Sequence, residues 1–576
     1  MAEVDHLVGA GVASRLSMPP PKRPLIEARR EQMFPTLEPA EIDRLRRFGE
    51  LRSYRAGEAL AKVGEVGHGL VLVLAGKVVV TRRDELGHRE LIVTHAPGGF
   101  LGELAQLSGR KTLVDAHAEE PVEAVVIPPE KLRALLVAEA DLGERVMRAL
   151  ILRRVGLIEA GAGPVIIGRP DDGDVLRLEN FLRRNGYPHH QLDPDTDADA
   201  QTLLERFHLD REHLPVVLCP SGQLLRNPGE MQLARCLGLV GPLDPAKVYD
   251  VAIVGAGPAG LATAVYAASE GLSVLVLDCR SFGGQAGASE RIENYLGFPT
   301  GISGIALMAR AYNQAQKFGV EMAIPATAVN LHGDDVEAAA PRVVLRLSSD
   351  ERVHARAVVV ASGARYRRLD LSDLRAFESR SVHYWASPVE AKLCAGQEVA
   401  LVGGGNSAGQ AVVSLASHVA KVWLLARGPS LDARMSRYLV DRIAGLPNVE
   451  VVTGAEVTAL EGRAGALEAI RWRRAGKEVR RPMNHLFLFI GADPNTDWLS
   501  GSDLALDDKG FVRAGPDVGV DRRPLETSRP GVFAIGDVRS GSVKRVAAAV
   551  GEGAQVVATL HAFLAEASRA PVVAKA

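Results

Sequence analysis

Two glycine-rich loops, each placed between an apolar strand and a helix-forming stretch, restrict the possible folds of this chain most strongly. The first loop follows the apolar run 249–254 and reads Gly-Ala-Gly-Pro-Ala-Gly from Gly255 to Gly260. The second follows 398–402 and reads Gly-Gly-Gly-Asn-Ser-Ala from Gly403 to Ala408, about 150 residues later. A strand, a glycine loop and a helix in this order are typical of the βαβ unit that holds the diphosphate of a dinucleotide. The sequence therefore predicts two Rossmann-like α/β domains.

The first loop has a residue suited to each physical task of such a unit. Gly255 permits the tight turn, Gly257 lets the backbone approach a diphosphate, and Gly260 lets the helix pack closely on the strand. The helix N-terminus attracts the phosphate charge. The next strand, 273–277, ends at Asp278, whose carboxylate would accept hydrogen bonds from a ribose diol.

The second loop differs from the first in the residue that follows its next strand. The strand 421–425 leads into Arg427 and not into an acidic residue. A carboxylate there would bind the 2′-hydroxyl of NADH, whereas a guanidinium would bind the 2′-phosphate of NADPH. Arg427, helped by Arg434 or Arg437, therefore favours NADPH; the alternative is that Arg427 is a solvated strand end, and the cofactor preference stays open. The predicted NADPH-binding residues are Gly403, Gly405, Asn406, Ser407, Ala408, Arg427, Arg434 and Gly491.

Length and composition indicate a folded protein of several domains. The chain has 576 residues, a hydrophobic share of 47% and a formal net charge of −2. Near-neutral charge argues against nucleic-acid binding through bulk electrostatics. There is no uninterrupted apolar run of membrane-spanning length and no secretion signal at the N-terminus, so we expect a cytoplasmic protein with no nucleic-acid or membrane partner.

The segments before the first glycine loop divide into two further domains. Residues 34–163 combine short β-branched runs with glycine turns and end in helical periodicity, which predicts a β roll capped by helices. Residues 164–240 alternate strands and helices, which predicts a small α/β domain. A flexible lead-in at 1–33, a linker at 241–248 and a tail at 566–576 complete the expected organisation.

The third part of the chain resembles the thioredoxin reductases at five separate motifs. These are Ser281–Gln285, Ile292–Pro299, Ala361–Ala364, Gly531–Asp537 and Lys544–Ala547. The resemblance implies FAD as prosthetic group, with a late aspartate against its ribityl chain. The FAD-binding residues implied are Gly255, Gly257, Pro258, Ala259, Gly260, Asp278, Gly284, Gln285, Asn294, Ala328, Ser362, Gly363, Gly536, Asp537, Arg545, Val546 and Ala547.

The same resemblance implies the order of parts and the reaction. A flavin half at 249–365 and 493–565 would enclose a nicotinamide half at 366–492, and hydride would pass from NADPH to FAD. The nicotinamide half would have to rotate on its two connecting strands for the donor to reach the flavin. A homodimer is also implied. No residue of the chain is assigned as a catalytic acid or base.

The chain departs from this family at the redox-active dithiol. Thioredoxin reductases of this type carry a Cys-x-x-Cys ahead of the nicotinamide loop, where Trp385 and Pro388 stand here. Neither residue can form a thiolate or a disulfide. Among the four cysteines of the chain no two are three positions apart, and Cys394 and Cys279 are expected to be single thiols, Cys279 with a packing role. A dithiol reductase is therefore not expected.

The domain at 164–240 resembles thioredoxin and glutaredoxin but is equally devoid of a dithiol. The resemblance rests on its element order and on Leu214-Pro215, a bond that is usually cis in the family. Where that family has Cys-x-x-Cys, this chain reads Arg-Pro-Asp-Asp from Arg169 to Asp172. We infer that this domain is an adaptor or spacer. Cys219 and Cys236 are expected to be buried structural thiols.

The stretch from Phe100 to Lys111 resembles the phosphate cassette of cyclic-nucleotide-binding domains. In that family a glutamate binds the ribose 2′-hydroxyl, and Glu103 matches it, whereas the position of the phosphate-binding arginine falls on Thr112. The candidate sensor residues are Gly102, Glu103, Leu104, Arg110, Lys111 and Thr112. The ligand could be a cyclic nucleotide, another nucleotide or none, and in the last case the domain would serve dimer contacts.

Two hypotheses of function follow. The leading one is a FAD-dependent NADPH oxidoreductase that passes electrons to an unidentified acceptor, such as oxygen, a quinone, a ferredoxin or flavodoxin, or a disulfide of a partner. A nucleotide at the first domain would regulate it. The alternative is a signalling or scaffold protein whose flavin reports redox state without turnover.

Overall fold

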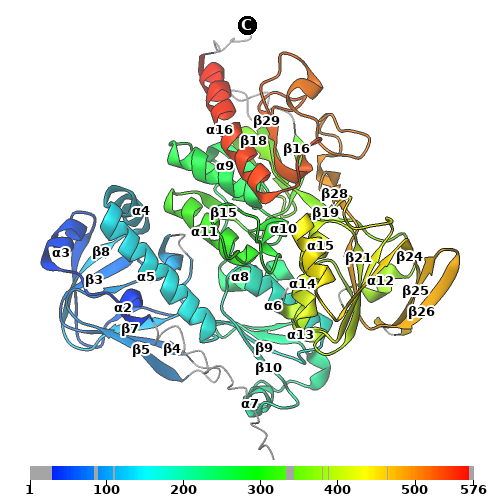
Figure 1. The fold of residues 1–576 in the computed structure, drawn as a ribbon. Helices are drawn as coiled ribbons and strands as arrows, with labels where there is room; N and C mark the ends of the chain where they lie inside the picture. The colour runs from blue at the N-terminus through cyan, green and yellow to red at the C-terminus, as the bar shows by residue number, and fades with distance from the viewer. Residues whose placement is uncertain are drawn as a thin grey trace, which may run out of the picture.

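The structure is a computed structural model, and it describes residues 29–569 except 84–87, 108–109, 333–342, 379, 387 and 464. In Figure 1 the first domain (blue and cyan) and the nicotinamide half (yellow and orange) lie on opposite sides, with the flavin half (green and red) above. The middle domain (teal) lies between these three parts. Predictions for 1–28, 570–576, Ser108, Gly109 and Ser387 fall outside the described residues.

The first domain is a β roll closed by helices, as the sequence predicted. Its strands form two four-stranded sheets with the orders β1-β8-β3-β6 and β2-β7-β4-β5. Its elements are α2 (Arg30–Met33), α3 (Pro39–Arg46), β1 (Glu50–Tyr54), β2 (Ala59–Ala61), β3 (Leu70–Ala75), β4 (Val78–Arg83), β5 (Arg89–His95), β6 (Phe100–Leu101), the 3-10 turn η1 (Leu104–Leu107), β7 (Asp115–Ala118), β8 (Val122–Ile127), α4 (Pro129–Ala138) and α5 (Ala140–Glu159). The apolar faces of α4 and α5 pack on the first sheet through Leu132, Leu135 and Val146.

The predicted lead-in ends earlier than expected. Residues 30–33 form the short helix α2, which packs against α5 and buries Met33 to 1% exposure. Met33 also offers its carbonyl to the buried guanidinium of Arg153 at 2.8 Å. The proline-rich composition of the preceding residues gave no sign of this one-turn helix. A helix this short is stabilised by its packing and not by its own length.

The middle domain is a four-stranded mixed sheet with helices packed on it. Its order is β10-β9-β11-β12, with β10 parallel to β9 and the last two strands antiparallel. The elements are β9 (Val165–Ile167), α6 (Gly173–Arg184), β10 (His190–Leu192), α7 (Ala198–Arg206), η2 (Arg211–His213), β11 (Val216–Leu218), β12 (Leu224–Arg226) and α8 (Glu230–Leu237). The Leu214–Pro215 bond is cis, and the Arg169–Asp172 stretch lies at the start of α6, where Asp172 caps the helix.

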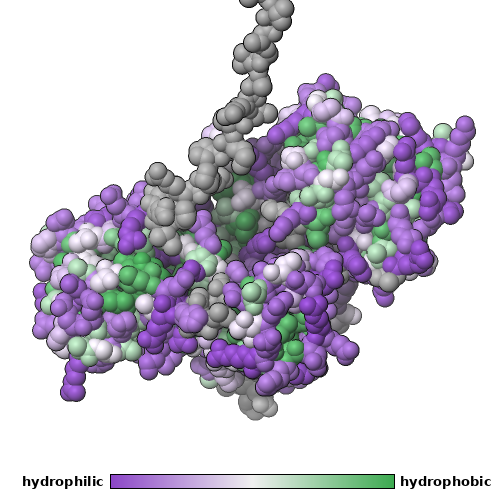
Figure 2. Space-filling model, turned by 90° about the horizontal axis from the view of Figure 1, so that it is seen from below, coloured by the Kyte–Doolittle hydropathy of each residue, from purple (hydrophilic) through white to green (hydrophobic). Residues whose placement is uncertain are grey.

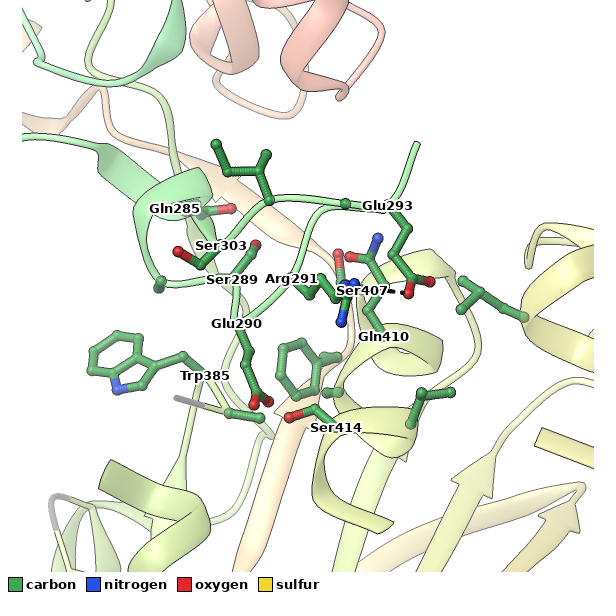
Figure 3. A pocket seen from close by; sticks show the side chains of 18 of the residues that line it. Gln285, Ser289, Glu290, Arg291, Glu293, Ser303, Trp385, Ser407, Gln410 and Ser414 are labelled. Carbon is green, nitrogen blue, oxygen red and sulfur yellow. Dashed lines mark ion pairs between the residues drawn. The ribbon is translucent and has the colours of Figure 1, made fainter. Parts of the chain in front are cut away.

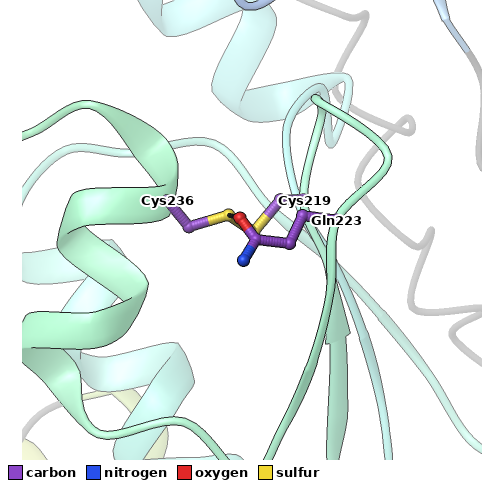
Figure 4. Close-up of a disulfide and its surroundings, with 3 residues drawn as sticks. All are labelled: Cys219, Gln223 and Cys236. Atoms are coloured by element: carbon purple, nitrogen blue, oxygen red, sulfur yellow. Dashed lines mark hydrogen bonds between the residues drawn. A yellow bond between two sulfur atoms is a disulfide. The ribbon is translucent and has the colours of Figure 1, made fainter.

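The prediction of free thiols in this domain was wrong. Cys219, after β11, and Cys236, near the end of α8, form a disulfide across 17 residues of sequence (Figure 4). Sequence spacing could not reveal it, because strand and helix bring the two residues together only in the folded domain. Cys219 is buried, whereas Cys236 keeps solvent exposure and contacts Gln223.

The flavin half is built on a seven-stranded sheet. The path is β15-β14-β13-β18-β17-β16, and β29 pairs with the C-terminal part of β18. Its elements are β13 (Val248–Val254), α9 (Pro258–Ser269), β14 (Val274–Leu277), α10 (Gly284–Gly287), α11 (Gly304–Lys317), β15 (Glu321–Ala323), β16 (Ala328–His332), β17 (Val343–Leu347), β18 (Arg352–Val360), η3 (Asp497–Leu499), η4 (Gly515–Val518), β29 (Val532–Ala534), η5 (Gly536–Val538) and α16 (Val546–Arg569). Helices α9, α11 and α16 bury one face of this sheet. The buried segments of the parallel strands, 251–254 in β13, 274–277 in β14 and 357–360 in β18, are wholly apolar, as buried parallel strands require.

The nicotinamide half is inserted between two short antiparallel strands, β19 (Ala364–Tyr366) and β28 (Ala492–Pro494). Its parallel sheet has the order β20-β27-β21-β22-β23, and a three-stranded antiparallel sheet, β24-β25-β26, covers it. The elements are α12 (Leu374–Phe377), β20 (Val382–His383), α13 (Pro388–Leu393), β21 (Glu398–Gly403), α14 (Asn406–Ala416), β22 (Lys421–Ala426), α15 (Arg437–Ala444), β23 (Val449–Thr453), β24 (Ala455–Arg463), β25 (Ala466–Arg474), β26 (Lys477–Pro482) and β27 (Leu486–Phe489).

Within the part of the chain that the structure describes, one helix has the length and mean hydropathy that a membrane span would need. This is α16, over Val546–Ala567. It contacts α9 along its length and buries Val556, Val557 and Leu560 in the core of the flavin half. The surface seen in Figure 2 is mainly hydrophilic, with apolar side chains in small scattered patches.

Candidate functional site

The segments predicted to hold a flavin meet around one cavity of about 350 Å³. The start of α9, the α10 turn, the 289–295 loop, β19, η5 and the start of α16 contribute to its wall. Of the predicted FAD residues, those lining it are Gly257, Pro258, Ala259, Gly284, Gln285, Asn294, Gly536, Asp537, Arg545, Val546 and Ala547. Motifs up to 290 residues apart in sequence thus form one concave site.

Two glycines of the first loop are needed for the fold. Gly255 has a φ of +115°, and a Cβ there would lie 2.1 Å from the carbonyl oxygen of Ala361. A Cβ on Gly260 would lie 1.9 Å from the carbonyl oxygen of Gly255. Gly257, by contrast, faces the open cavity, where the nearest atom to such a Cβ is the Cα of Gly284 at 3.9 Å. The geometry at Gly255 and Gly260 agrees with the tight turn and the close helix packing expected of them, and the diphosphate contact of Gly257 stays a prediction.

Asp278 is engaged differently from the prediction. Its carboxylate accepts hydrogen bonds from the backbone N–H groups of Ala256 (3.0 Å), Arg280 (3.0 Å) and Ser281 (3.2 Å). Burial raises the pKa of Asp278, although these three donors act in the opposite direction. In this structure the residue ties the glycine loop to the 279–281 turn, and its contact with a ribose stays a prediction.

Three other predicted FAD residues stand outside the cavity wall. Ser362 donates its hydroxyl to the carbonyl of Asn495 at 2.8 Å, and Gly363 accepts the Asn495 N–H at 3.0 Å. These two hydrogen bonds join the two chain segments that connect the flavin half with the nicotinamide half. Ala328 starts β16 and is buried in the core behind the sheet.

Asp537 and Tyr366 give the cavity its electrostatic character. Burial raises the pKa of Asp537, the charge of Lys544 lowers it, and that of Glu552 raises it. Burial also raises the pKa of Tyr366 to about 12, with the Asp537 charge acting in the same direction and the Ser407 hydroxyl opposing it. Tyr366 was missed in the sequence because it stands beyond the Ala361–Ala364 motif, and only its place at the junction of the two halves identifies it.

The nicotinamide loop already faces this cavity. Asn406, Ser407 and Gln410, from the start of α14, line the same wall as Tyr366 and Asp537. Gly403 ends β21, where a Cβ would lie 2.7 Å from the carbonyl of Phe489 and 2.8 Å from the Ala408 side chain. The N-terminus of α14 and the flavin-binding segments therefore share one space.

The arginines predicted for a 2′-phosphate lie near the second loop. Arg427 and Arg434 are exposed, and neither forms an ion pair among the residues that the structure describes. The Arg434 carbonyl lies 3.9 Å from the position of a Cβ on Gly405. Arg437 is instead paired with Asp441 at 2.8 Å and Asp432 at 3.5 Å. Gly491 lies beside the junction of the two halves, where its carbonyl accepts the N–H of Arg367. It lines neither the flavin cavity nor the neighbouring cavity described next.

A second cavity of about 450 Å³ adjoins the first and separates the two halves. Both cavities share Gln285, Ser289, Tyr366, Ser407 and Gln410 in their walls. Figure 3 shows Gln285, Ser289 and Glu290 of the flavin half facing Ser407, Gln410 and Ser414 of α14, with Trp385 at one side. The Oε2 atom of Glu290 is buried without a hydrogen-bond partner in the described part of the chain.

The position expected for a dithiol is filled by a packed indole. Trp385 donates its Nε1–H to the buried carboxylate of Glu390 at 2.9 Å. Cys394 is fully buried, and burial, followed by the charge of Glu390, raises its thiol pKa to about 12. Surrounding protein desolvates the Cys279 sulfur and, with the Asp278 charge, raises its pKa to about 11. Neither thiol is poised as a nucleophile at neutral pH.

One group of side chains has the donor atoms of a metal site. The ligating atoms of His383, Cys394 and His485 lie within 4.8 Å of one another. The two imidazoles contact each other at 3.1 Å, and burial lowers the pKa of His383 to about 3 and that of His485 to about 4. The two histidines and Cys394 thus form one compact cluster in the nicotinamide half.

The first domain encloses its own cavity of about 400 Å³. Gly102, Glu103 and Thr112 line it, and both carboxylate oxygens of Glu103 lack a hydrogen-bond partner among the described residues. The nearest charge is the Arg154 guanidinium, 3.6 Å away. Arg153 lies in the wall, bonded to three backbone carbonyls, and burial lowers its pKa to about 9.

The remaining sensor candidates point out of this cavity. Arg110 donates to the Tyr312 hydroxyl of α11 at 2.6 Å, and Leu104 and Arg110 line a small cavity between domains. The Lys111 side chain lies against Gly238, after α8, where a Cβ would be 2.8 Å from its Cδ. Arg110 and Lys111, the two cations at the end of the cassette, therefore contact the flavin half and the middle domain.

Comparison with known proteins agrees with this arrangement. Residues 249–553 match the family model described as pyridine nucleotide-disulphide oxidoreductase, and residues 51–139 match that of the cyclic nucleotide-binding domain. The thioredoxin reductase of Mycolicibacterium smegmatis is 31% identical over 55% of this chain and 97% of that protein. An alkyl hydroperoxide reductase component from Pseudomonas putida is 33% identical over 59% of this chain. This match spans 61% of that relative's length, and the match to NADPH-dependent thioredoxin reductase 3 of Arabidopsis thaliana spans 58% of that protein.

Solved structures give the same result. The thioredoxin reductase of Lactococcus lactis, in its FR conformation, matches 55% of this chain and 99% of its own with a TM-score of 0.50 at 25% identity. That of T. acidophilum matches equally, at 27% identity. Proteins of this thioredoxin-reductase-like type use FAD and NADPH. This chain therefore belongs to the pyridine nucleotide-disulphide oxidoreductase family, is similar in fold to thioredoxin reductases over its third part, and carries a cyclic nucleotide-binding domain ahead of that part.

Proposed function

We propose that this protein is an NADPH-dependent flavin reductase that delivers electrons to an acceptor other than a dithiol of its own. The observation that carries the proposal is the single cavity lined by Gly257, Gly284 and Asp537 of the flavin half and by Asn406 and Ser407 of the nicotinamide loop. A hydride donor and acceptor must lie in one such space for transfer to occur. Because the sequence has no Cys-x-x-Cys, we infer that the electrons pass to an acceptor other than a dithiol of this chain.

The residues around the cavity fit FAD. Gly257 and Gly284 expose backbone where a diphosphate must approach closely, and α9 directs its N-terminus there. Asp537 is a partly buried carboxylate placed to accept hydrogen bonds from hydroxyl groups of a ribityl chain. When bound, FAD would supply the two-electron acceptor that side chains lack. The chain's own residues bind it, orient it and exclude water.

The nicotinamide half supplies selectivity for the donor. Arg427 and Arg434 would bind a 2′-phosphate, because each is exposed and without an ion-pair partner among the described residues. The N-terminus of α14 would receive the diphosphate. Ser407, beside Tyr366, would place the nicotinamide end toward the flavin cavity.

The acceptor is expected outside this chain's cysteines. The second cavity gives a small acceptor such as oxygen or a quinone a route to the flavin cavity, with which it shares five residues. Glu290 lies in the wall of this cavity, and its Oε2 atom, which has no hydrogen-bond partner among the described residues, would face such an acceptor. A ferredoxin, a flavodoxin or a partner's disulfide remains the alternative class. Oxidising the reduced protein with each class in turn distinguishes them.

A nucleotide at the first domain is proposed as the regulator. The support is an enclosed cavity with a 4% exposed Glu103, the residue type that binds a ribose hydroxyl; its carboxylate faces Arg154 at 3.6 Å but has no hydrogen-bond partner among the described residues. Thr112 stands where a phosphate-binding arginine would be expected, which favours a ligand without the usual cyclic-phosphate contact. The middle domain, with Arg169–Asp172 in place of a dithiol, is proposed as an adaptor, and a cytoplasmic homodimer as the assembly.

Anaerobic reduction tests the proposal. The purified full chain should show a flavin spectrum that NADPH bleaches at least about tenfold faster than NADH at equal concentration, as selective 2′-phosphate contacts require. Oxidation by an added acceptor should then restore the colour. A yellow protein that neither nucleotide bleaches would support the alternative, a scaffold whose flavin is not turned over.

A further inference from the structure

The C-terminal end of α6 contacts all three other parts of the molecule within three consecutive residues. Arg184 donates to the carbonyl of Gly284 at 2.9 Å, and Asn185 donates to the carbonyl of Arg280 at 3.1 Å, both in the flavin half. Gly186 accepts a hydrogen bond from Arg154 of the first domain at 3.2 Å. Figure 1 shows α6 and α8 in the space between the flavin half, the first domain and the nicotinamide half.

Arg184 links the two halves of the reductase directly. Besides its bond to Gly284 in the flavin cavity wall, its guanidinium carbon lies 5.8 Å from the centroid of the Trp385 ring, in the nicotinamide half. Burial, followed by the charge of Arg280, lowers the pKa of Arg184. A partly buried guanidinium needs its carbonyl and aromatic partners, because losing either leaves a partly desolvated charge without compensation.

Further charges draw the middle domain to the nicotinamide half. The pKa of Asp171 is lowered first by its hydrogen bond from Arg169, and also by the charge of Arg380. Burial acts to raise the pKa of Glu179, but His189, Arg183 and Lys392 together lower it. Arg380 and Lys392 both belong to the nicotinamide half, on either side of Trp385.

The two halves are also held by contacts of their own. Arg442 of α15 pairs with both carboxylate oxygens of Glu293, at 2.9 and 3.0 Å, across the second cavity. Ser407 lies beside Tyr366 in the flavin cavity. Rotation of the nicotinamide half on β19 and β28 would separate Glu293 from Arg442 and Arg184 from Trp385.

We propose that Arg184 is a positioning residue that holds the nicotinamide half in the arrangement in which its glycine loop faces the flavin cavity. The middle domain is then a brace, and the rotation implied by the resemblance to thioredoxin reductases is not part of this protein's cycle. The inference rests on the proposed flavin reductase function. The missing dithiol is consistent with this. A reductase with no internal dithiol to present to the flavin has no need to rotate its nicotinamide half into a second orientation.

The first experiment follows flavin bleaching in a single anaerobic turnover as NADPH is varied. Arg184→Ala should lower the limiting bleaching rate by about tenfold or more, because misplacement of the donor by about 1 Å has effects of this size. The half-saturating NADPH concentration should change less than about twofold, since the nucleotide contacts are untouched. Arg184→Lys should recover part of the rate, and Arg235→Ala, at an exposed arginine of α8 in the same domain, is the matched control.

The second experiment fixes the orientation by a covalent link. Glu293→Cys and Arg442→Cys, in a Cys279→Ser background, are joined with a short bismaleimide, and the unjoined protein serves as control. The joined protein should bleach at the unjoined rate, and joining should restore the rate of the Arg184→Ala variant. Loss of bleaching on joining would show that rotation is needed and overturn the inference.

Two other outcomes also contradict it. Wild-type rates in Arg184→Ala would remove the positioning role, and a slow Arg184→Ala variant that joining does not restore would make Arg184 merely structural. If the unmodified wild-type protein is not bleached at all, it is the proposed function that fails. The two failures are therefore distinguishable.

Discussion

Two exposed arginines past the second glycine loop, Arg427 and Arg434, would decide between NADPH and NADH. Arg427→Ala should raise the KM for NADPH by about tenfold and leave that for NADH nearly unchanged, as loss of one charge-assisted phosphate contact predicts. Steady-state kinetics with both nucleotides measure it. Arg437→Ala, whose guanidinium is paired with Asp441 and Asp432, is the matched control. Equal changes in the KM values for NADPH and NADH would show that Arg427 is a solvated strand end that does not contact the 2′-phosphate.

Buried imidazoles make stability depend on pH. Burial lowers the pKa of His383 from its usual 6.5 to about 3, so the folded protein excludes a proton that the unfolded chain binds. The stabilisation is complete above pH 6.5 and is lost progressively as pH falls from there toward 3, by up to ~1.4 kcal/mol per pH unit.

Urea unfolding between pH 7 and pH 4.5 tests this sign. His383→Gln should unfold more easily at pH 7 but show a flatter fall with acidification than the wild type. His418→Gln, at an exposed histidine of the same half, should keep the wild-type slope. A slope unchanged in His383→Gln would place the acid sensitivity elsewhere.

At the scale of elements, local pattern was enough to place most helices and strands. The strands expected at 249–254, 273–277, 398–402 and 421–425 lie within one residue of their expected bounds, because the apolar pattern that identifies them is local. What the pattern could not give depends on distant parts of the chain. Helix α2 exists through its packing on α5, and the Cys219–Cys236 disulfide through the packing of α8 on β11.

The same division holds for the site. Gly255, Gly257, Gly260 and Asp537 could be found from motifs, since each has a fixed place relative to a strand. Tyr366 and Arg184 could not, because their importance arises from neighbours far away in sequence. Asp278 shows an intermediate case, in which the motif located the residue but not its three backbone partners.

The close packing of α9 on β13 at Gly260 can be tested by substitution. Gly260→Ala places a Cβ 1.9 Å from the Gly255 carbonyl, so α9 must move away from β13 and the purified protein should lack bound flavin. Absorbance at 450 nm relative to 280 nm measures flavin content. Gly551→Ala, in α16 with nothing within 4 Å of the new Cβ, should retain full colour. A yellow Gly260→Ala protein would contradict the proposal that the first glycine loop binds the diphosphate.

At the scale of the whole molecule, a chain of contacts leads from the first domain's cavity to the flavin cavity. Glu103 lies 3.6 Å from Arg154, Arg154 bonds Gly186, and Arg184 bonds Gly284. If a nucleotide changes the bleaching rate, Arg154→Ala should abolish the change while nucleotide binding persists. Bleaching with and without cAMP, cGMP or AMP, together with calorimetric titration of each, measures this. A full effect in Arg154→Ala would place the coupling on another contact, such as Arg110–Tyr312.

The electron capacity of the intact protein tests the central claim most directly. An anaerobic titration with NADPH should end at one equivalent per flavin, because no dithiol adjoins the flavin cavity among the described residues and the sequence holds no Cys-x-x-Cys. A Cys219→Ser/Cys236→Ser variant should take the same single equivalent, which excludes the disulfide of the middle domain as an electron store. Consumption of a second equivalent by the wild type, or a colourless protein that does not take up FAD, would contradict the account.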